Sequence, residues 1–577
     1  MPIFRTVLVG VLVVSPLLAQ TPNTLVLVAD DVGVDAISSY GLGSNPAPTP
    51  NINLLAATGI RFTNAQSCPL CSPTRASILT GRHSFRTGVG VALPNNAPGL
   101  DGSEVLLPEI LAPAGIQTAM IGKWHLGNDL GPLTPTAEGF GTFTGTIGGV
   151  VPSYYQWPKV TNGTVQQSTA YVTRDTVDDA LAYVQAATQP WFLMVTFHAG
   201  HEPYEAPPSA LHTQNLAGLN PQTTPIPFFH AMVQAMDTEI GRLLQGLTPG
   251  TFANTNIVFL GDNGSSSEVT ESPFDPQRAK GSIYQGGIHV PLIVKGPAVV
   301  GGPRVEPALV HVVDLFATLA AMQGVDAAAS VPGSVELDSI SAMPLLAAPG
   351  QPAPRTFSYS QFFAGSTAMT TPDDTEMMRD SQFEVLRFVR QNGTIREEMY
   401  DLVGDPWETN DLLLQPLSPT AAAAYRTLRR ELAKLRGLAW SASYGTGCSG
   451  AGVNPVFNVV PSTSPTIGTT FTLRMPITSP AVLLTVGAIG FQNTTWGGLP
   501  LPFDLGVIGM TGCMLWTDLA ITSVLAQTAV AATMPVVLPN DPASIGTPLY
   551  MQAFPLVTGA NPAGILATNA IEVIVGG

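Results

Sequence analysis

Three largely apolar runs occur in the first half of the chain. They cover Asn23 to Ala29, Trp191 to Phe197 and Ile257 to Leu260. Short continuous apolar runs are typical of strands that are buried on both faces of a parallel sheet. We therefore predict buried parallel strands at these three positions.

Segments with helical periodicity lie between and after these runs. From Phe229 to Leu244 apolar side chains recur at helical spacing, and a second such segment runs from Val310 to Met322. Strands that alternate with helices indicate an α/β fold with a largely parallel sheet. In such sheets, ligands bind beyond the carboxyl ends of the strands.

Polar residues gather at those predicted strand ends. Asp30 and Asp31 follow the first run, Asp262 and Asn263 follow the last one, and His201 lies a few residues beyond the middle one. The four carboxylate and amide groups offer hard oxygen ligands, which suit Ca²⁺ or Mg²⁺ and bind zinc poorly. A single Asp is more often a helix cap or turn residue. Two matching pairs at strand ends favour a metal site.

The pattern changes beyond residue 351. From Pro352 to Leu412 short segments alternate between apolar and polar positions, as in Phe383 to Phe388, which predicts a smaller antiparallel sheet. A helix is expected from Thr420 to Leu438. Its face rich in Arg, Lys and Glu should lie in solvent.

Charged residues become rare after Cys448. Those that remain are Arg474, Asp504, Asp518, Asp541 and Glu572. Short apolar segments at 471–475, 481–486 and 571–575, separated by glycine and proline, predict a β-sandwich. We find no catalytic constellation in this domain. Carbohydrate binding, attachment to a cell surface and solubilisation all stay open as its role.

The net charge limits the partners. The chain has 24 Lys and Arg against 40 Asp and Glu, which gives a formal net charge of -16. This charge would repel a phosphate backbone, and no run of Lys or Arg provides a local exception, so nucleic acid is not expected as a partner. An anionic substrate would need a local positive site. The few buried cations of the chain are therefore of interest.

The N-terminus has the three parts of a secretory signal. Arg5 is the positive start, Val7 to Val14 is the apolar stretch, and Leu17 to Ala19 is a processing site before Gln20. The apolar stretch is too short to span a bilayer, and no later stretch is long enough. We expect export to the periplasm, the extracellular space or the cell surface, with no membrane span after signal removal; an uncleaved anchor is the alternative.

Four cysteines occur, at positions 68, 71, 448 and 513. Exported proteins normally oxidise cysteines that can meet, and we expect Cys448 and Cys513 to pair. The spacing of Cys68 and Cys71 would also fit a redox or zinc Cys-x-x-Cys motif. No second pair of ligands follows at zinc spacing, which argues against that interpretation.

The most specific local pattern is Cys-x-Pro-x-Arg, from Cys71 to Arg75, which continues to Arg82. Alone it could be a turn with a buried thiol. The segment resembles the signature of the sulfatase family, a branch of the alkaline phosphatase-like hydrolases, and further motifs of that family follow in the family's order. They are an opening strand with an Asp pair at 22–35, Gly-Lys-Trp-His-Leu-Gly at 122–127, His-x-Pro at 201–203, Asp-Asn-Gly at 262–264, a Lys-Gly segment at 280–287, Tyr-Asp-Leu at 400–402 and Asp-Pro-x-Glu at 405–408.

This resemblance implies the fold and the domain organisation. The fold should be α/β, with an alkaline phosphatase-like, mostly parallel sheet flanked by helices, a small antiparallel C-terminal subdomain and an appended all-β sandwich. We predict a signal peptide at 1–19, a sulfatase catalytic domain at 20–350, a smaller α+β subdomain of the same unit at 351–440, and the sandwich at 441–577.

The resemblance also implies the nucleophile and the cofactor. Cys71 would be oxidised after translation to formylglycine, with a formylglycine-generating enzyme as the partner in maturation. One Ca²⁺ per chain, with Mg²⁺ as the alternative, would be held by Asp30, Asp31, Cys71, Asp262 and Asn263. The substrate would be a sulfate ester, and export favours a sulfated polysaccharide or other glycan.

The remaining catalytic roles follow from the same motifs. By resemblance Arg75 and Lys123 would orient and stabilise the formylglycine hydrate, and His125 would be the base for its collapse. His201 and Lys280 would contact the sulfate and protonate the leaving oxygen.

The chain also departs from the family pattern. Gln285 to His289 stands where the family often has Glu-Gly-Gly-x-Arg, so local salt bridges should differ. Gly145 to Gly149 lacks the serine with which some arylsulfatases contact sulfate, which puts the substrate class in question. We expect His198 and His311 to be structural.

Two other functions remain open at this point. Related enzymes of the same superfamily hydrolyse phosphomonoesters, phosphodiesters or phosphonates, but they more often assemble two zinc ions from additional Asp and His ligands. Alternatively, the chain could be a catalytically silent, secreted binding protein whose sandwich carries the function.

Overall fold

The computed structural model describes residues 21–188, 190–364 and 374–577. The predicted signal peptide at 1–19 lies outside these residues. Within them, no helix combines the length and the apolar character needed to cross a bilayer. The chain divides into two compact units. The first contains the chain up to Met377 with Arg387–Arg396 and Pro406–Glu408, and the second contains Met378–Leu386, Glu397–Asp405 and Thr409–Gly577.

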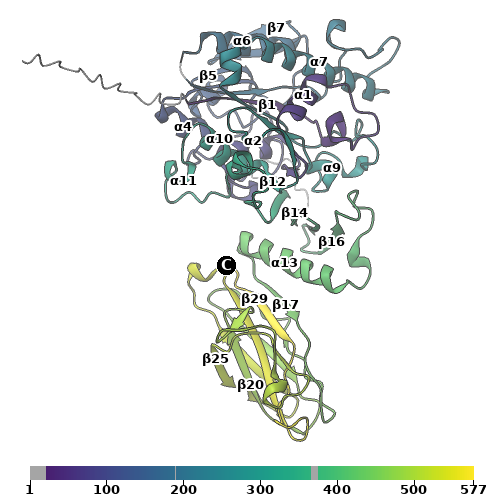
Figure 1. Ribbon diagram of the computed structural model, residues 1–577, viewed down its shortest axis with the longest axis vertical. Coiled ribbons are helices and arrows are strands. Elements are labelled where there is room, and N and C mark those ends of the chain that lie inside the picture. The colour runs from purple at the N-terminus through teal and green to yellow at the C-terminus, as the bar shows by residue number, and fades with distance from the viewer. Residues whose placement is uncertain (1–20, 189, 365–373) are drawn as a thin grey trace, which may run out of the picture. The chain divides into compact units, whose positions relative to one another are not determined.

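The first unit is built on a ten-stranded sheet (Figure 1). In spatial order its strands are β11 (Arg304–Glu306), β2 (Ile60–Phe62), β10 (Leu292–Lys295), β9 (Thr255–Gly261), β1 (Asn23–Ala29), β8 (Trp191–Thr196), β4 (Gln117–Lys123), β5 (Thr142–Thr146), β6 (Trp157–Thr161) and β7 (Thr164–Ser168). The central strands β9, β1, β8, β4 and β5 run parallel, whereas β10, β6 and β7 are antiparallel to their neighbours. The predicted α/β fold with a mostly parallel sheet is confirmed.

Alternate side chains of the central strands enter two separate cores. Val26 and Val28 of β1 belong to one apolar cluster, and Leu25 and Leu27 belong to the other. This alternation explains why the strand is apolar throughout, since both of its faces are covered. The first core also holds side chains of α2 (Cys71–Thr80), α4 (Leu107–Leu111) and α10 (Leu315–Met322), and the second those of α1 (Pro50–Thr58), α6 (Val172–Ala186) and α7 (Pro225–Gln245) (Figure 1).

The two predicted helices of this unit had different outcomes. The first is confirmed as α7, which begins with Pro225 in its first turn. The helix predicted from Val310 was wrong at its start, because β12 (Val310–His311) and a 3₁₀ turn (Val312–Asp314) precede α10. The ring nitrogen Nδ1 of His311 accepts a hydrogen bond from the Val313 amide at 3.1 Å, which ends the strand and caps the turn.

A four-stranded sheet follows, and the predicted strand at 383–388 is confirmed within it. Its order is β13 (Ser358–Phe362), β14 (Asp374–Arg379), β15 (Phe383–Val389) and β16 (Ile395–Asp401). The predicted helix after it is α13 (Pro419–Arg436). Its charged face is only partly exposed, contrary to expectation, because Arg429 pairs with Glu397 and Arg430 pairs with Glu572.

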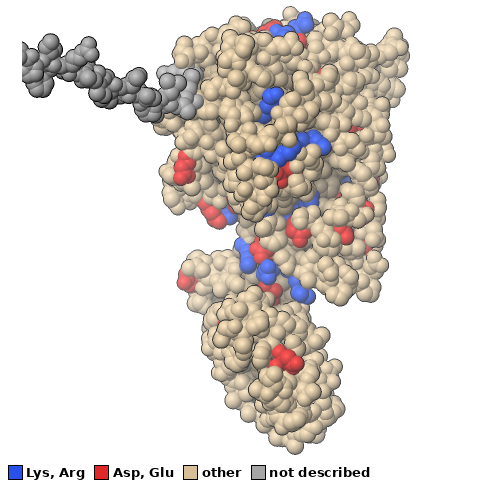
Figure 2. Space-filling view, in the orientation of Figure 1, with Lys and Arg blue, Asp and Glu red and all other residues tan. Residues whose placement is uncertain are grey.

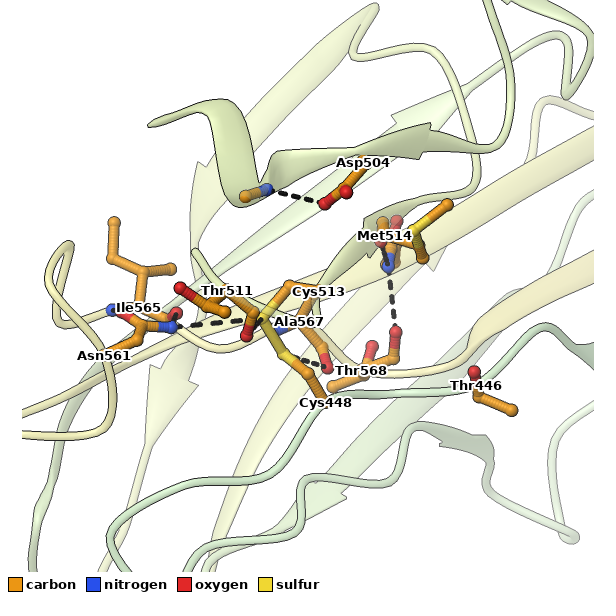
Figure 3. Close-up of a disulfide and its surroundings, with 12 residues drawn as sticks. Thr446, Cys448, Asp504, Thr511, Cys513, Met514, Asn561, Ile565, Ala567 and Thr568 are labelled. Atoms are coloured by element: carbon orange, nitrogen blue, oxygen red, sulfur yellow. Dashed lines mark hydrogen bonds between the residues drawn. A yellow bond between two sulfur atoms is a disulfide. The ribbon is translucent and has the colours of Figure 1, made fainter. Parts of the chain in front are cut away.

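The end of the second unit contains two antiparallel sheets. One has the order β17 (Trp440–Tyr444), β29 (Ala570–Ile574), β28 (Pro548–Val557), β20 (Val482–Gly490) and β25 (Ile521–Val524), and the other has the order β18 (Asn458–Val459), β19 (Thr470–Pro476), β27 (Ala531–Val537) and β26 (Ala526–Gln527). Leu473 of β19 and Met551 of β28 belong to a single apolar core, so the two sheets pack face to face as a β-sandwich. The predicted disulfide between Cys448 and Cys513 is present (Figure 3).

Candidate active site

The predicted polar residues lie at one edge of the ten-stranded sheet. In the parallel pair of β1 and β9, Ala29 lies opposite Gly261, so the residues that follow, Asp30 and Asp262, come side by side. The neighbouring strand β8 precedes His201, and β4 ends at Lys123. Parallel pairing therefore brings together side chains that are far apart in the sequence.

Cys71 is the first residue of α2, and every residue of this helix is buried. Its Sγ atom lies 3.1 Å from Nδ1 of His125. The other ring nitrogen, Nε2, lies 2.9 Å from the carbonyl oxygen of Leu93. A carbonyl can only accept a hydrogen bond, so Nε2 carries the proton and Nδ1 presents its lone pair to Cys71. Burial raises the pKa of the Cys71 thiol, although Lys123 partly opposes this shift.

Two cations bind the carboxylates at the bottom of the site. Lys123 Nζ lies 2.5 Å from Asp30 Oδ2, and Arg75 Nη2 lies 2.8 Å from Asp262 Oδ2. Arg75 Nη1 also donates to the main-chain oxygen of Lys123 at 2.7 Å. All four side chains are fully buried. Burial, together with the nearby charge of Asp30, raises the pKa of Asp262 to about 6 even though Arg75 opposes the shift.

Two further groups surround Asp31 and keep some exposure to solvent. Lys280 Nζ lies 2.6 Å from Asp31 Oδ2, and His201 Nε2 lies 3.8 Å from the same oxygen. Burial raises the pKa of Asp31, but the charges of Lys280, His201 and Lys123 outweigh it and leave the pKa below its usual range. Burial lowers the pKa of His201 to about 4, despite the opposing effect of Asp31.

The acidic cluster has the composition and the free oxygen atoms of a cation site. Oxygen atoms of Asp30, Asp31 and Asp262 lie within 4.8 Å of one another, and this is the sole cluster of its kind among the described residues. The buried atoms Asp30 Oδ1 and Asn263 Oδ1 accept no hydrogen bond from any described residue. Buried polar atoms normally have a partner, and hard oxygen donors are the ligands that Ca²⁺ and Mg²⁺ take. The residues present therefore fit a divalent cation.

The backbone at two of these residues is strained. Asp31 has a φ of 57° and His125 a φ of 58°, in the left-handed region that residues other than glycine rarely adopt. Such conformations persist where the surrounding structure imposes them, and they concentrate at functional sites. Each residue lies just beyond the end of a central strand, where the turn aims its side chain into the site.

Comparison with known proteins agrees with this geometry. The model of the family described as Sulfatase matches residues 22–325, and that described as N-sulphoglucosamine sulphohydrolase, C-terminal, matches residues 277–437. The chain belongs to the sulfatase family. Sulfatases hydrolyse sulfate esters, so the chain is a sulfuric ester hydrolase.

Individual sulfatases are similar over more than half of the chain. Arylsulfatase A of Homo sapiens is 30% identical in an alignment of 379 residues that covers 60% of this chain and 71% of that protein. N-acetylgalactosamine-6-sulfatase of Homo sapiens is 30% identical in an alignment of 361 residues that covers 57% of this chain and 66% of that protein. The crystal structure of Ps i-CgsB in complex with k-i-k-neocarrahexaose matches with a TM-score of 0.62 at 25% identity and covers 72% of this chain and 93% of that one.

Hydrogen bonds and ion pairs join most of the predicted sulfatase residues into one network. Asp31 is its centre, because its main-chain amide donates to Asp262 Oδ1 at 3.2 Å and its Oδ1 atom accepts a hydrogen bond from Asn263 Nδ2 at 2.9 Å. Cys71 and His125 form a second pair, which Lys123 reaches electrostatically. These residues are brought together as expected. Their individual roles stay predictions.

Some residues that shape this site carry no signal in the sequence. The Tyr154 hydroxyl lies 2.6 Å from the main-chain oxygen of His198 and 2.7 Å from that of His201, so it supports the turn that presents His201. The Leu93 carbonyl that orients His125 is a backbone atom, which no residue pattern reveals. His198 itself lies 2.8 Å from the Thr146 hydroxyl. At Gln285, where the family often has glutamate, the main-chain N–H donates to the Glu408 carboxylate at 2.9 Å.

Proposed function

We propose that this sulfatase hydrolyses sulfate monoesters with a formylglycine hydrate made from Cys71 and with one bound divalent cation. Ca²⁺ is the expected ion, and Mg²⁺ is the alternative. The observation that carries the proposal is the position of Cys71, whose Sγ atom lies 3.1 Å from the unprotonated nitrogen of His125 at the edge of a buried site that contains Lys123 and Arg75.

Asp30, Asp31, Asp262 and Asn263 are the groups that would hold the cation. The orphaned oxygens of Asp30 and Asn263 support this assignment. Cys71, once converted, would add a ligand. When bound, the cation would add positive charge beside the three carboxylates and attract a sulfate oxygen.

The reaction uses two hydroxyl groups on one carbon of residue 71. One hydroxyl gives its proton to one of the carboxylates near residue 71 and attacks the sulfur atom, and the S–O bond to the alcohol breaks. The second hydroxyl then gives its proton to Nδ1 of His125, the carbon collapses to the aldehyde, and sulfate leaves. A serine or an unmodified cysteine lacks the second hydroxyl and could not release sulfate in this way.

The cationic side chains would have separate roles. Lys123 and Arg75 lie at the buried side of the site, where they would orient and stabilise the hydrate. Lys280 and His201 lie at its accessible side, where they would contact the sulfate and protonate the leaving oxygen. Burial lowers the pKa of Lys280, but Asp31 outweighs burial and raises it above its usual range, so this lysine stays charged at neutral pH.

A sulfated glycan is the proposed substrate class. Support comes from the name of the relative N-acetylgalactosamine-6-sulfatase and from the complex of Ps i-CgsB with k-i-k-neocarrahexaose. Export, with removal of residues 1–19, would bring the enzyme to such substrates outside the cytoplasm. Maturation would then require a formylglycine-generating enzyme.

We also propose that residues 441–577 form a domain appended to the sulfatase unit.

Peptide mass spectrometry tests the mechanism. Protein from the native host should carry the aldehyde at position 71 and should hydrolyse 4-nitrophenyl sulfate much faster than 4-nitrophenyl phosphate. Cys71→Ala should abolish activity. The matched control is Cys68→Ala, which removes a second buried thiol that contacts Ser77 and Ser84 rather than His125, and it should stay active. An unmodified thiol in fully active protein would refute the proposal.

A further inference from the structure

The β-sandwich contains an apolar cavity of about 400 Å³, which we call the sandwich pocket. Every lining residue is apolar except Thr522. A volume of this size lies within the range of small-molecule sites, which are about 300–1,000 Å³. The pocket belongs entirely to residues 484–565 of the second unit, and none of its residues has a role in the proposed hydrolysis.

The floor of the sandwich pocket is the outer face of two paired strands. Leu484 and Val486 of β20 lie opposite Leu556 and Phe554 of β28, and all four side chains line the cavity. Ala553 and Val557 of β28, which precede Phe554 and follow Leu556, belong to the sandwich core. Because side chains alternate along a strand, these four residues form an apolar stripe on the face opposite the core, where a sandwich usually carries polar side chains.

The opposite wall is the long connection between β20 and β25. It contributes Trp496, Phe503 and Ile508, among others. This connection is anchored rather than loose, because the disulfide joins its Cys513 to Cys448 (Figure 3). In addition, the side-chain amide of Gln552 on β28 donates to the main-chain oxygen of Met514 at 2.9 Å. The wall is therefore fixed over the apolar stripe at a distance that leaves the cavity open.

The lining determines which ligands fit. A sugar or a sulfate group would lose its hydrogen bonds to water and find almost no partner, so both are excluded. The two charged residues in the connection that forms the wall, Asp504 and Asp518, are both acidic, which disfavours an anionic ligand. On the face shown in Figure 2 the sandwich presents few charged side chains of either sign. The class of ligand that fits the sandwich pocket is therefore uncharged and apolar.

The size of the cavity suits a single alkyl chain as the ligand. A methylene group occupies roughly the volume of one water molecule, about 30 Å³, so about 400 Å³ holds on the order of a dozen carbon atoms. The mouth is apolar too, since Ile508, Leu484 and Leu556 line the pocket and are still exposed to solvent.

We propose that the sandwich pocket binds the single alkyl chain of an uncharged amphiphile, such as a long-chain alcohol. This binding activity is separate from sulfate ester hydrolysis and does not rest on the proposed mechanism.

Displacement of N-phenyl-1-naphthylamine, an uncharged probe of apolar sites, from the full chain measures this binding. A series of alcohols from hexanol to tetradecanol should displace the probe, with the Kd falling about four-fold per methylene until the chain fills the cavity. The dodecanoate anion should bind more weakly than dodecanol. No displacement, or an affinity that does not change with chain length, would overturn the proposal.

Two matched pairs of variants locate the site. Ile508→Glu places a charge in the lining, whereas Val507→Glu places it one residue earlier on the same turn and outside the lining; the two side chains are 64% and 73% exposed. Leu484→Trp fills the cavity, whereas Leu483→Trp adds the same ring beside it. Ile508→Glu and Leu484→Trp should each weaken dodecanol binding at least tenfold, and the two controls should not.

Thermal unfolding of all four variants checks that they fold, independently of any activity on sulfate esters. Binding that is equal within both pairs would overturn the assignment to this cavity. A different result would be that alcohols displace no probe, while both variants of each pair associate equally with phosphatidylcholine vesicles. That result would overturn the proposal and indicate general adhesion to lipid surfaces instead.

Discussion

Lys123 Nζ lies 2.5 Å from Asp30 Oδ2, and neither side chain is exposed to solvent. The other oxygen of Asp30 accepts no hydrogen bond from the described residues, and Arg75 Nη2 lies 3.8 Å from it. One ammonium group therefore carries most of the compensation for a fully buried carboxylate. The stability of the cation-free protein and the chemistry of the site depend on the same pair.

Replacing Lys123 with methionine should destabilise the cation-free protein by about 3–5 kcal/mol, because it leaves Asp30 buried without its partner. Activity should be lost as well. The matched control is Lys159→Met, whose ammonium group pairs with Asp175 and Asp179 at a more exposed position. It should cost clearly less, because Asp175 and Asp179 keep contact with solvent, and it should keep activity. Chemical denaturation with a chelator present measures both. Equal losses in the two variants would contradict this account.

Adding Ca²⁺ to the chelated protein should stabilise it. At about one hundred times the Kd, the gain in the free energy of unfolding is about 2.7 kcal/mol. Asn263→Ala removes an oxygen atom that lacks a partner and should weaken cation affinity at least about tenfold. Asn256→Ala truncates another buried asparagine, on β9, away from the cluster, and should leave the affinity unchanged. Calorimetric titration would show whether the two variants differ.

His311 should make stability depend on pH. Burial lowers its pKa well below the usual value, and His83, edge-on at 5.2 Å, and Arg355 lower it further, although Asp314 opposes them. The unfolded chain therefore binds more protons below about pH 6.5, so this contribution to stability is complete above that pH. It is lost on acidification, by about 1.4 kcal/mol per pH unit.

His311→Asn tests this dependence. Asparagine can still accept the Val313 amide as a helix cap, but it does not titrate. The free energy of unfolding, measured from about pH 7.5 down to pH 5, should fall less steeply in the variant than in the wild type. Parallel curves would show that His311 contributes nothing to the acid sensitivity.

The disulfide should determine the stability of the sandwich. Its cysteines are 65 residues apart, and a loop of that length corresponds to about 4 kcal/mol of chain entropy in the unfolded state. Replacing Cys448 and Cys513 with serine should therefore reduce hydrogen-exchange protection in β20 and β28. Cys68→Ser, a change in the other unit, should leave the protection of those strands as it was.

Local patterns were sufficient for much of the fold. The apolar run from Asn23 to Ala29 predicted β1 correctly because both faces of that strand are covered, and the helical spacing after Phe229 predicted α7. The helix predicted from Val310 failed because His311 caps a turn there, which a periodicity cannot reveal. The order of the ten strands, with antiparallel strands at both sides, depends on long-range pairings that no local pattern contains.

The sequence motifs predicted which residues form the candidate site. They did not predict the contacts that orient those residues. The residues around Cys71 were expected to converge because each follows a strand or begins a helix at one edge of the sheet. The Leu93 carbonyl and the Tyr154 hydroxyl orient His125 and His201 through contacts between distant segments. The sandwich pocket likewise arises from tertiary packing, since exposed and buried apolar residues look alike in the sequence.

The burial of Cys71 determines whether its proposed oxidation comes before or after folding. The thiol is 1% exposed, and it begins a helix in which every residue is buried. Another enzyme cannot reach it in the folded protein, so the oxidation proposed for Cys71 has to take place while the chain is still unfolded. Under that proposal, a molecule that folds before this step would keep its thiol and stay inactive. The yield of active sulfatase would then depend on the rate of modification relative to the rate of folding.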